Sequence, residues 1–143
     1  MGLTTALLLA AVLGSRPEPP GALALANAAE ASVSVLGPIP GTSAQKTIAL
    51  LLVTADEESG FRMDRTGDSG HSHCAMQVWT DADVSTPDAC MRAALEIMHA
   101  SRRECGKAHP LARYCGGCDR PAAQRIADRR ERRAAAVVRS VHF

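Results

Sequence analysis

The chain has 143 residues and a formal net charge of +1, and 46% of its residues are hydrophobic. This size fits one domain with a modest core, and the near-zero net charge excludes a dominant electrostatic partner for the chain as a whole. Aromatic residues make up only 3% of the chain, so the predicted core is thin and would gain from cross-links.

The first 14 residues form an apolar run that has the length of a signal-peptide core and is too short to span a bilayer. No basic residue precedes this run, so an ordinary apolar terminal helix is the alternative interpretation. Small residues between Ala22 and Ala26 provide a possible cleavage point. We therefore expect a secreted or periplasmic protein, of bacterial or phage origin, with no stable membrane span.

Residues 14–42 contain five prolines among alanines and glycines, which is typical of a linker or a processed segment. Residues 32–36, Ser-Val-Ser-Val-Leu, could form a short strand within it. The expected organisation is a signal-like segment and linker over residues 1–42, followed by one folded domain over residues 43–143.

Three helices are predicted in that domain from capping residues, proline positions and apolar spacing. They run from Thr42 or Ser43 to about Glu58, from Thr86-Pro87 to about Glu104, and from Pro121 to about Val138. The polar segment 59–85 carries several turn signals and is predicted to form one wall of a cleft. Little chain remains for a large sheet, so the expected fold class is mainly α.

Four of the five cysteines lie between Cys90 and Cys118. In a small exported domain this density predicts one or two disulfides and one free thiol. Cys105–Cys118 is the first pairing expected, because it would tie the end of a helix to the following loop, and Cys74–Cys90 is the next. Two groups also have the ligand types of a zinc site, although not the spacing of a common module: His71, His73 and Cys74, and Cys105, His109, Cys115 and Cys118.

Three short motifs follow one another in a fixed order. Glu58-Ser59 ends an apolar helix, Ala75-Met76-Gln77 follows a glycine-rich loop, and Tyr114 stands two residues before a glycine pair. In this order the motifs resemble the lysozyme-like superfamily, and most closely the soluble lytic transglycosylase domain, over roughly residues 44–139. Cys74 and Cys115 stand where the family pattern has glycine and asparagine.

The resemblance implies a small lysozyme-like helical domain with a catalytic cleft. It also implies cleavage of the β-1,4 bond between N-acetylmuramic acid and N-acetylglucosamine in peptidoglycan, with one glutamate and with no cofactor or metal. Glu58 would be the acid and then the base, and Glu57 would replace it if the register slipped. Substrate-binding or orienting roles fall to Ser59, Met76, Gln77 and Tyr114.

The chemistry also follows from the residues themselves. Protonation of a leaving glycosidic oxygen near neutral pH requires a carboxyl group in a protected environment, because an ordinary glutamate titrates near 4.3. A glutamate at the end of a buried helix, facing a loop-built cleft, meets this requirement. A second carboxylate would change the outcome to hydrolysis, and Asp68 and Asp64 are the candidates.

Seven arginines lie between Arg120 and Arg139, and the simplest interpretation is a solvated helix. No aromatic residue is interleaved with them to stack on bases, so no nucleic-acid partner is expected. The expected partner is the glycan strand of peptidoglycan, bound by a monomer. Two alternatives remain, a non-catalytic glycan-binding relative of the fold and a small zinc-binding interaction module.

Overall fold

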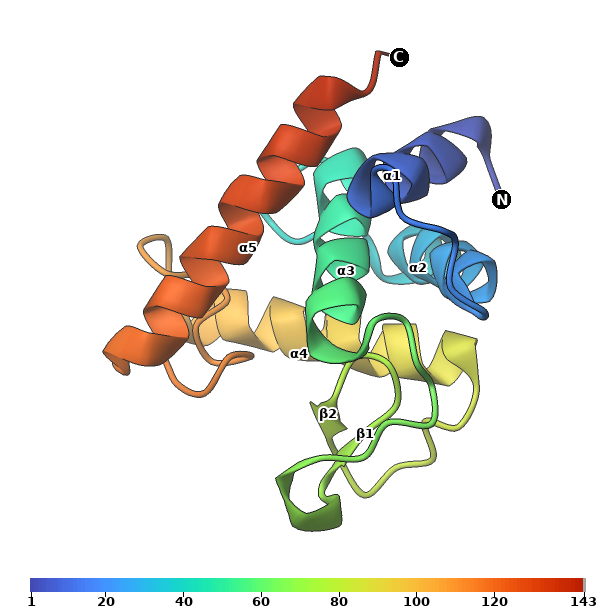
Figure 1. The fold of residues 1–143 in the computed structure, drawn as a ribbon. Coiled ribbons are helices and arrows are strands. Elements are labelled where there is room, and N and C mark those ends of the chain that lie inside the picture. Colours follow the sequence, from blue (N-terminus) through green and yellow to red (C-terminus); the bar gives the residue numbers. More distant parts are fainter. Residues whose placement is uncertain (143) are drawn as a thin grey trace.

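A computed structural model describes residues 1–142 and shows a mainly helical molecule (Figure 1), as predicted. Within these residues the α-helices are α1 Leu3–Leu13, α2 Ala22–Leu36, α3 Ala44–Ser59, α4 Pro87–Cys105 and α5 Pro121–Ser140. The segment between α3 and α4 contains the short helix η1 Asp68–Gly70 and the strands β1 Ser72–His73 and β2 Val78–Trp79. The two strands pair antiparallel, with Ser72 opposite Trp79.

The three helices predicted from capping signals are confirmed as α3, α4 and α5. The hydroxyl of Ser43 accepts a hydrogen bond from the backbone N–H of Lys46 at 3.0 Å, which satisfies a free donor at the start of α3. Thr86 caps α4 in the same way, and Pro87 occupies its first position. At the other end of α3, Gly60 has a φ of 61°, the left-handed conformation that commonly ends a helix.

Helix α3 lies at the centre of the molecule, in contact with α1, α2, α4 and α5 (Figure 1). Every residue from 47 to 55 is buried, so this part of the helix has no solvent-facing side. A helix that is apolar all round needs neighbours on every side, which the other four helices provide. Its two ends are less buried, and the last turn carries the half-buried Glu58 next to the β1–β2 segment.

The strand expected at residues 32–36 is wrong, because these residues belong to the helix α2, which occupies about half of the segment 14–42. Its alanine-rich face, with Leu25, Ala26 and Ala29 fully buried, packs against α4. The prolines lie in the connections before and after α2, and residues 32–36 form its last turns. The possible cleavage point at Ala22–Ala26 falls in the first turns of this helix.

Helix α1 packs against α3 and α5 and buries a cluster of four side chains, Leu8, Leu9, Val12 and Leu13. In this structure residues 1–42 therefore contribute to the same hydrophobic core as residues 43–142. No helix among the described residues is long and apolar enough to cross a membrane.

Two disulfides are present, Cys74–Cys90 and Cys105–Cys118, and Cys115 is a free thiol. Both expected pairings are confirmed. The first disulfide ties the β1–β2 segment to α4, and the second ties the loop after α4 back to the end of that helix. They remove Cys74, Cys105 and Cys118 from the zinc sets and leave His71, His73, His109 and Cys115. Of these four, His109 pairs with Asp128 at 3.0 Å.

Candidate active site

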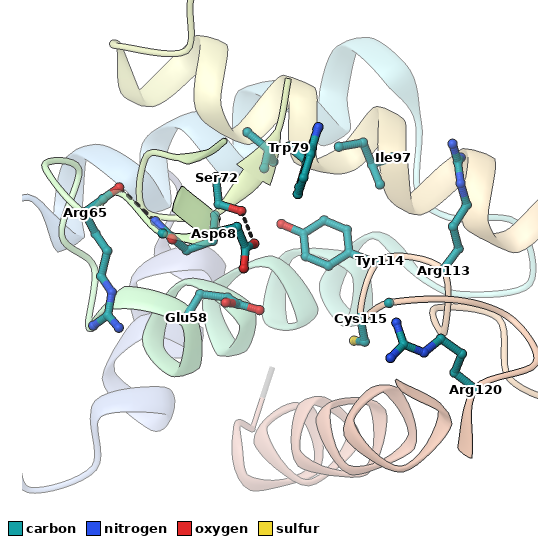
Figure 2. A pocket seen from close by; sticks show the side chains of 14 residues that line it. Glu58, Arg65, Asp68, Ser72, Trp79, Ile97, Arg113, Tyr114, Cys115 and Arg120 are labelled. Atoms are coloured by element: carbon teal, nitrogen blue, oxygen red, sulfur yellow. Dashed lines mark hydrogen bonds between the residues drawn. The ribbon is translucent and has the colours of Figure 1, made fainter. Parts of the chain in front are cut away.

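The last turn of α3 borders a cavity of about 890 Å³ (Figure 2). The other walls come from the β1–β2 segment, from α4 and from the loop between α4 and α5. Four of the predicted site residues line this cavity: Glu58, Asp68, Gln77 and Tyr114. Side chains from three separate parts of the sequence therefore meet in one cleft, and a cavity of this size is typical of a ligand site.

Glu58 is the carboxylate that α3 presents to the cavity, and its side chain is 27% exposed. A guanidinium nitrogen of Arg130, on α5, lies 2.8 Å from its Oε1 atom. The Arg130 side chain is only 8% exposed, so this charge is held between α3 and α5 rather than in solvent. Burial alone would lower the pKa of Arg130, but the charge of Glu58 raises it above its ordinary value.

The two preceding carboxylates face α5 and do not line the cavity. Asp56 pairs with Arg133 at 2.6 Å and with Arg16 at 2.9 Å, and Glu57 pairs with the arginines of α5 at positions 129, 130 and 133. Burial alone would raise the pKa of both carboxyl groups, but hydrogen bonds from these arginines lower it instead. Glu57, which was the alternative acid, therefore serves as an ion-pair partner of α5.

Ser59 and Met76 are buried behind the cavity wall and support it rather than line it. The hydroxyl of Ser59 donates to the carbonyl oxygen of Ala75 at 2.8 Å, and the hydroxyl of Tyr114 donates to the carbonyl oxygen of Met76 at 2.6 Å. The second motif is thus hydrogen-bonded to the first motif on one side and to the third on the other.

Tyr114 and Cys115 form the wall opposite the last turn of α3 (Figure 2). Burial raises the pKa of the Tyr114 phenol well above its ordinary value, and the charge of Glu58 raises it further. The tyrosine is therefore a neutral hydrogen-bond donor. Burial also raises the pKa of the Cys115 thiol to about 11, although the charge of Arg130 opposes this. The thiol is therefore protonated near neutral pH.

Gln77 braces the loop that precedes it. Its side-chain Nε2 atom donates to the carbonyl oxygen of Arg65 at 2.8 Å and to that of Cys74 at 2.7 Å. Its Oε1 atom lies 2.7 Å from the position that a Cβ atom on Gly67 would occupy, so a larger residue would not fit there without movement. Gln77 therefore fixes this loop and also lines the cavity.

The segment from Asp68 to Gln77 has an unusual backbone. Asp68, Ser69, Cys74 and Gln77 all have φ between 49° and 59°, a left-handed conformation that residues other than glycine rarely adopt. Such strain persists only where the surrounding structure imposes it, and it is often found at functional sites. At Cys74, the disulfide bond to Cys90 holds the residue in that conformation.

Asp68 extends into the cavity near Glu58 and accepts a hydrogen bond from the hydroxyl of Ser72 (Figure 2). Asp64, the other candidate for a second carboxylate, does not line the cavity. It forms an exposed pair with Arg62 at 3.3 Å.

Sequence reasoning missed several residues that contribute to the cavity or adjoin it. The indole of Trp79, on β2, is 65% exposed and stacks on His71 with ring centroids 4.6 Å apart. It is the chain's single tryptophan and stands two residues after Gln77, which could have indicated its role. The cavity is also lined by three arginines that no motif indicated, Arg65, Arg113 and Arg120.

The chain was compared with protein-family models, curated proteins and solved structures, and nothing matches it in any of the three comparisons.

Proposed function

We propose that this protein is a glycosidase that cleaves the β-1,4 bond between N-acetylmuramic acid and N-acetylglucosamine in peptidoglycan. The observation that carries the proposal is the convergence of three motifs around Glu58. Ser59 and Tyr114 are hydrogen-bonded to the backbone of Ala75 and Met76, and Glu58 borders the cavity that these segments enclose. The order of these motifs in the chain is the order found in soluble lytic transglycosylases.

The proposed reaction uses one carboxyl group twice. Glu58 first donates its proton to the glycosidic oxygen, and the bond between that oxygen and C1 of the muramic acid breaks. The ionised Glu58 then accepts the proton of the C6 hydroxyl, whose oxygen forms a new bond to C1. The products are a 1,6-anhydro sugar and a free 4-hydroxyl, no water is consumed, and Glu58 regains its proton.

Two features beside Glu58 support the proposed reaction. Between the two steps the adjacent Arg130 would stabilise the negative charge. The exposed indole of Trp79 offers a flat apolar face for one side of a sugar ring.

Asp68 gives specific support to a second outcome, hydrolysis. Its carboxylate shares the cavity with Glu58, and a second carboxylate can activate a water molecule or stabilise the intermediate. The two outcomes leave different product ends, a 1,6-anhydro sugar in one case and a reducing sugar in the other.

Mass analysis of muropeptides released from purified peptidoglycan tests this proposal. We expect 1,6-anhydro products, and we expect Asp68→Asn to change neither the product ends nor the order of magnitude of the rate. Asp64→Asn is the matched control outside the cavity. Reducing ends that disappear in Asp68→Asn and persist in Asp64→Asn would identify a hydrolase.

We also propose that the protein works in a secreted or periplasmic compartment. Two disulfides are typical of proteins that fold under oxidising conditions, and peptidoglycan lies outside the cytoplasm.

A further inference from the structure

More positive than negative side chains line the cavity. Arg65, Arg113 and Arg120 are positive, whereas Glu58 and Asp68 are the carboxylates in the lining. All three arginines are exposed to solvent, so a ligand can reach them without any movement of the chain. Glu58 already has Arg130 as its partner, so none of the three is needed to balance it.

Two of these arginines lie on the same side of the cavity, with their guanidinium groups pointing in different directions (Figure 2). Figure 2 shows Arg113 and Arg120 beyond Tyr114, on the opposite side from Arg65. Both come from the loop between α4 and α5, which the Cys105–Cys118 disulfide ties to α4. Arg113 makes one exposed ion pair, with Glu104 at 3.2 Å, and within residues 1–142 Arg120 makes none.

The side chain of Arg120 is positioned by a glycine pair. A Cβ atom on Gly117 would lie 3.2 Å from Cδ and 3.3 Å from Cγ of Arg120, so the arginine stem lies directly over this glycine. A guanidinium nitrogen likewise lies 3.7 Å from the position of a Cβ atom on Gly116. The two glycines therefore leave room for the stem of Arg120 beside the cavity wall, and the side chain stays exposed.

We propose that Arg113 and Arg120 form a carboxylate-binding subsite, by which the cleft selects glycan strands that carry carboxylates over neutral N-acetylglucosamine polymers. Guanidinium groups match carboxylates in charge and in hydrogen-bond geometry. This subsite rests on the proposed function for the identity of the strand. The carboxylate has two possible sources, the lactyl group of the muramic acid and the peptide stem attached to it.

Calorimetric binding in a Glu58→Gln background, which keeps the strands intact, tests the subsite. The probes are peptide-bearing glycan strands, strands stripped of peptides by an amidase, and a neutral N-acetylglucosamine hexamer. Each exposed ion pair is expected to contribute about two- to fivefold in affinity, so Arg113→Gln with Arg120→Gln should lose about tenfold on carboxylate-bearing strands and nothing on the hexamer. Circular dichroism melting checks that each variant is folded.

Arg132→Gln with Arg139→Gln is the matched control, because it makes the same change in net charge on α5 and outside the cavity. A second variant, Gly117→Ala, keeps both arginines and displaces the stem of Arg120, so we expect part of the same loss. A loss confined to peptide-bearing strands would place the carboxylate on the peptide. A loss on stripped strands as well would place it on the lactyl group.

Equal affinity of the double variant and its background for all three probes would overturn the subsite. Cleavage of peptidoglycan by the chain that carries Glu58, combined with that result, would leave the proposed function in place. The opposite combination, no cleavage but an arginine-dependent preference for carboxylates, would support the subsite and refute the glycosidase.

Discussion

Single residues beside this cleft have roles that depend on their backbone as much as on their side chains. Cys74 is held at φ 59°, and its partner Cys90 is fully buried on α4. A disulfide that closes a loop of this length contributes about 3 kcal/mol, mainly through the unfolded state. The same position also carries the steric penalty of a Cβ atom in the left-handed region.

These two effects can be separated by a pair of variants that both lack the disulfide. We expect Cys74→Gly with Cys90→Ala to be more stable than Cys74→Ala with Cys90→Ala by roughly 1 kcal/mol, because glycine adopts positive φ without the Cβ penalty. Urea unfolding of both proteins gives the difference directly. Equal midpoints, or a more stable alanine variant, would show that the backbone relaxes once the bond is removed.

Other residue roles were open to sequence reasoning only in part. Glu58, Tyr114 and Gln77 were identified because each belongs to a short motif. Arg113 and Arg120 were not, because they lie in a loop with no periodicity, and the direction of a loop side chain depends on turns such as the one at Gly117.

At the scale of elements, α3 and α5 are joined by a network of three carboxylates and four arginines. Its members are Asp56, Glu57, Glu58, Arg16, Arg129, Arg130 and Arg133. The basic helix was expected to be solvated, yet one face of it is paired with the end of α3. This network fixes the last turn of α3, which presents Glu58 to the cavity.

The network predicts loss of stability in acid. The pKa values of Asp56 and Glu57 are lowered on folding, so the unfolded chain binds more protons as the pH falls through this range. Their contribution is complete above the ordinary pKa values of 3.8 and 4.5 and is lost as the pH falls through the lowered ones. Thermal unfolding between pH 7 and pH 2.5 should show this loss.

Asp56→Asn should remove part of this effect. We expect the free energy of unfolding at pH 7 to fall by roughly 1–3 kcal/mol, because Arg133 and Arg16 lose the buried carboxylate that pairs with them. We also expect the stability of the variant to fall less steeply in acid. Asp119→Asn, an exposed change in the loop before α5, is the control. A variant with the acid limb of the wild type would contradict a role for Asp56 in the acid transition.

The elements themselves were predictable where local signals agreed. Caps and first-turn prolines placed α3, α4 and α5 close to their observed bounds. Helix α2 was missed because prolines surround it and because its alanines give little contrast between apolar and polar faces. Its helical state depends on packing against α4, and α4 is too far away in the sequence for a short sequence window to include both helices.

For the whole molecule, the question is whether residues 43–143 fold alone. Helix α1 buries four aliphatic side chains, and each such side chain contributes about 1.5–3 kcal/mol. That sum is comparable to the total stability of a small protein, about 5–15 kcal/mol. Helix α2 adds further buried area against α4.

We therefore expect a chain that begins at residue 43 to lose its cooperative thermal transition, whereas the full chain keeps it. Circular dichroism and calorimetry on the two proteins provide the comparison, with both disulfides verified by thiol counting. A truncated protein that melts cooperatively near the temperature of the full chain would show that α1 and α2 are dispensable.

We propose that Glu58, and not its neighbour Glu57, carries the chemistry. Digestion of purified peptidoglycan by the wild type, by Glu58→Gln and by Glu57→Gln tests this most directly, at a temperature where all three are folded. We expect the wild type to release muropeptides, Glu58→Gln to lose at least about a hundredfold in rate, and Glu57→Gln to keep the same order of magnitude. No release by the wild type, or release by Glu58→Gln at the wild-type rate, would contradict the account.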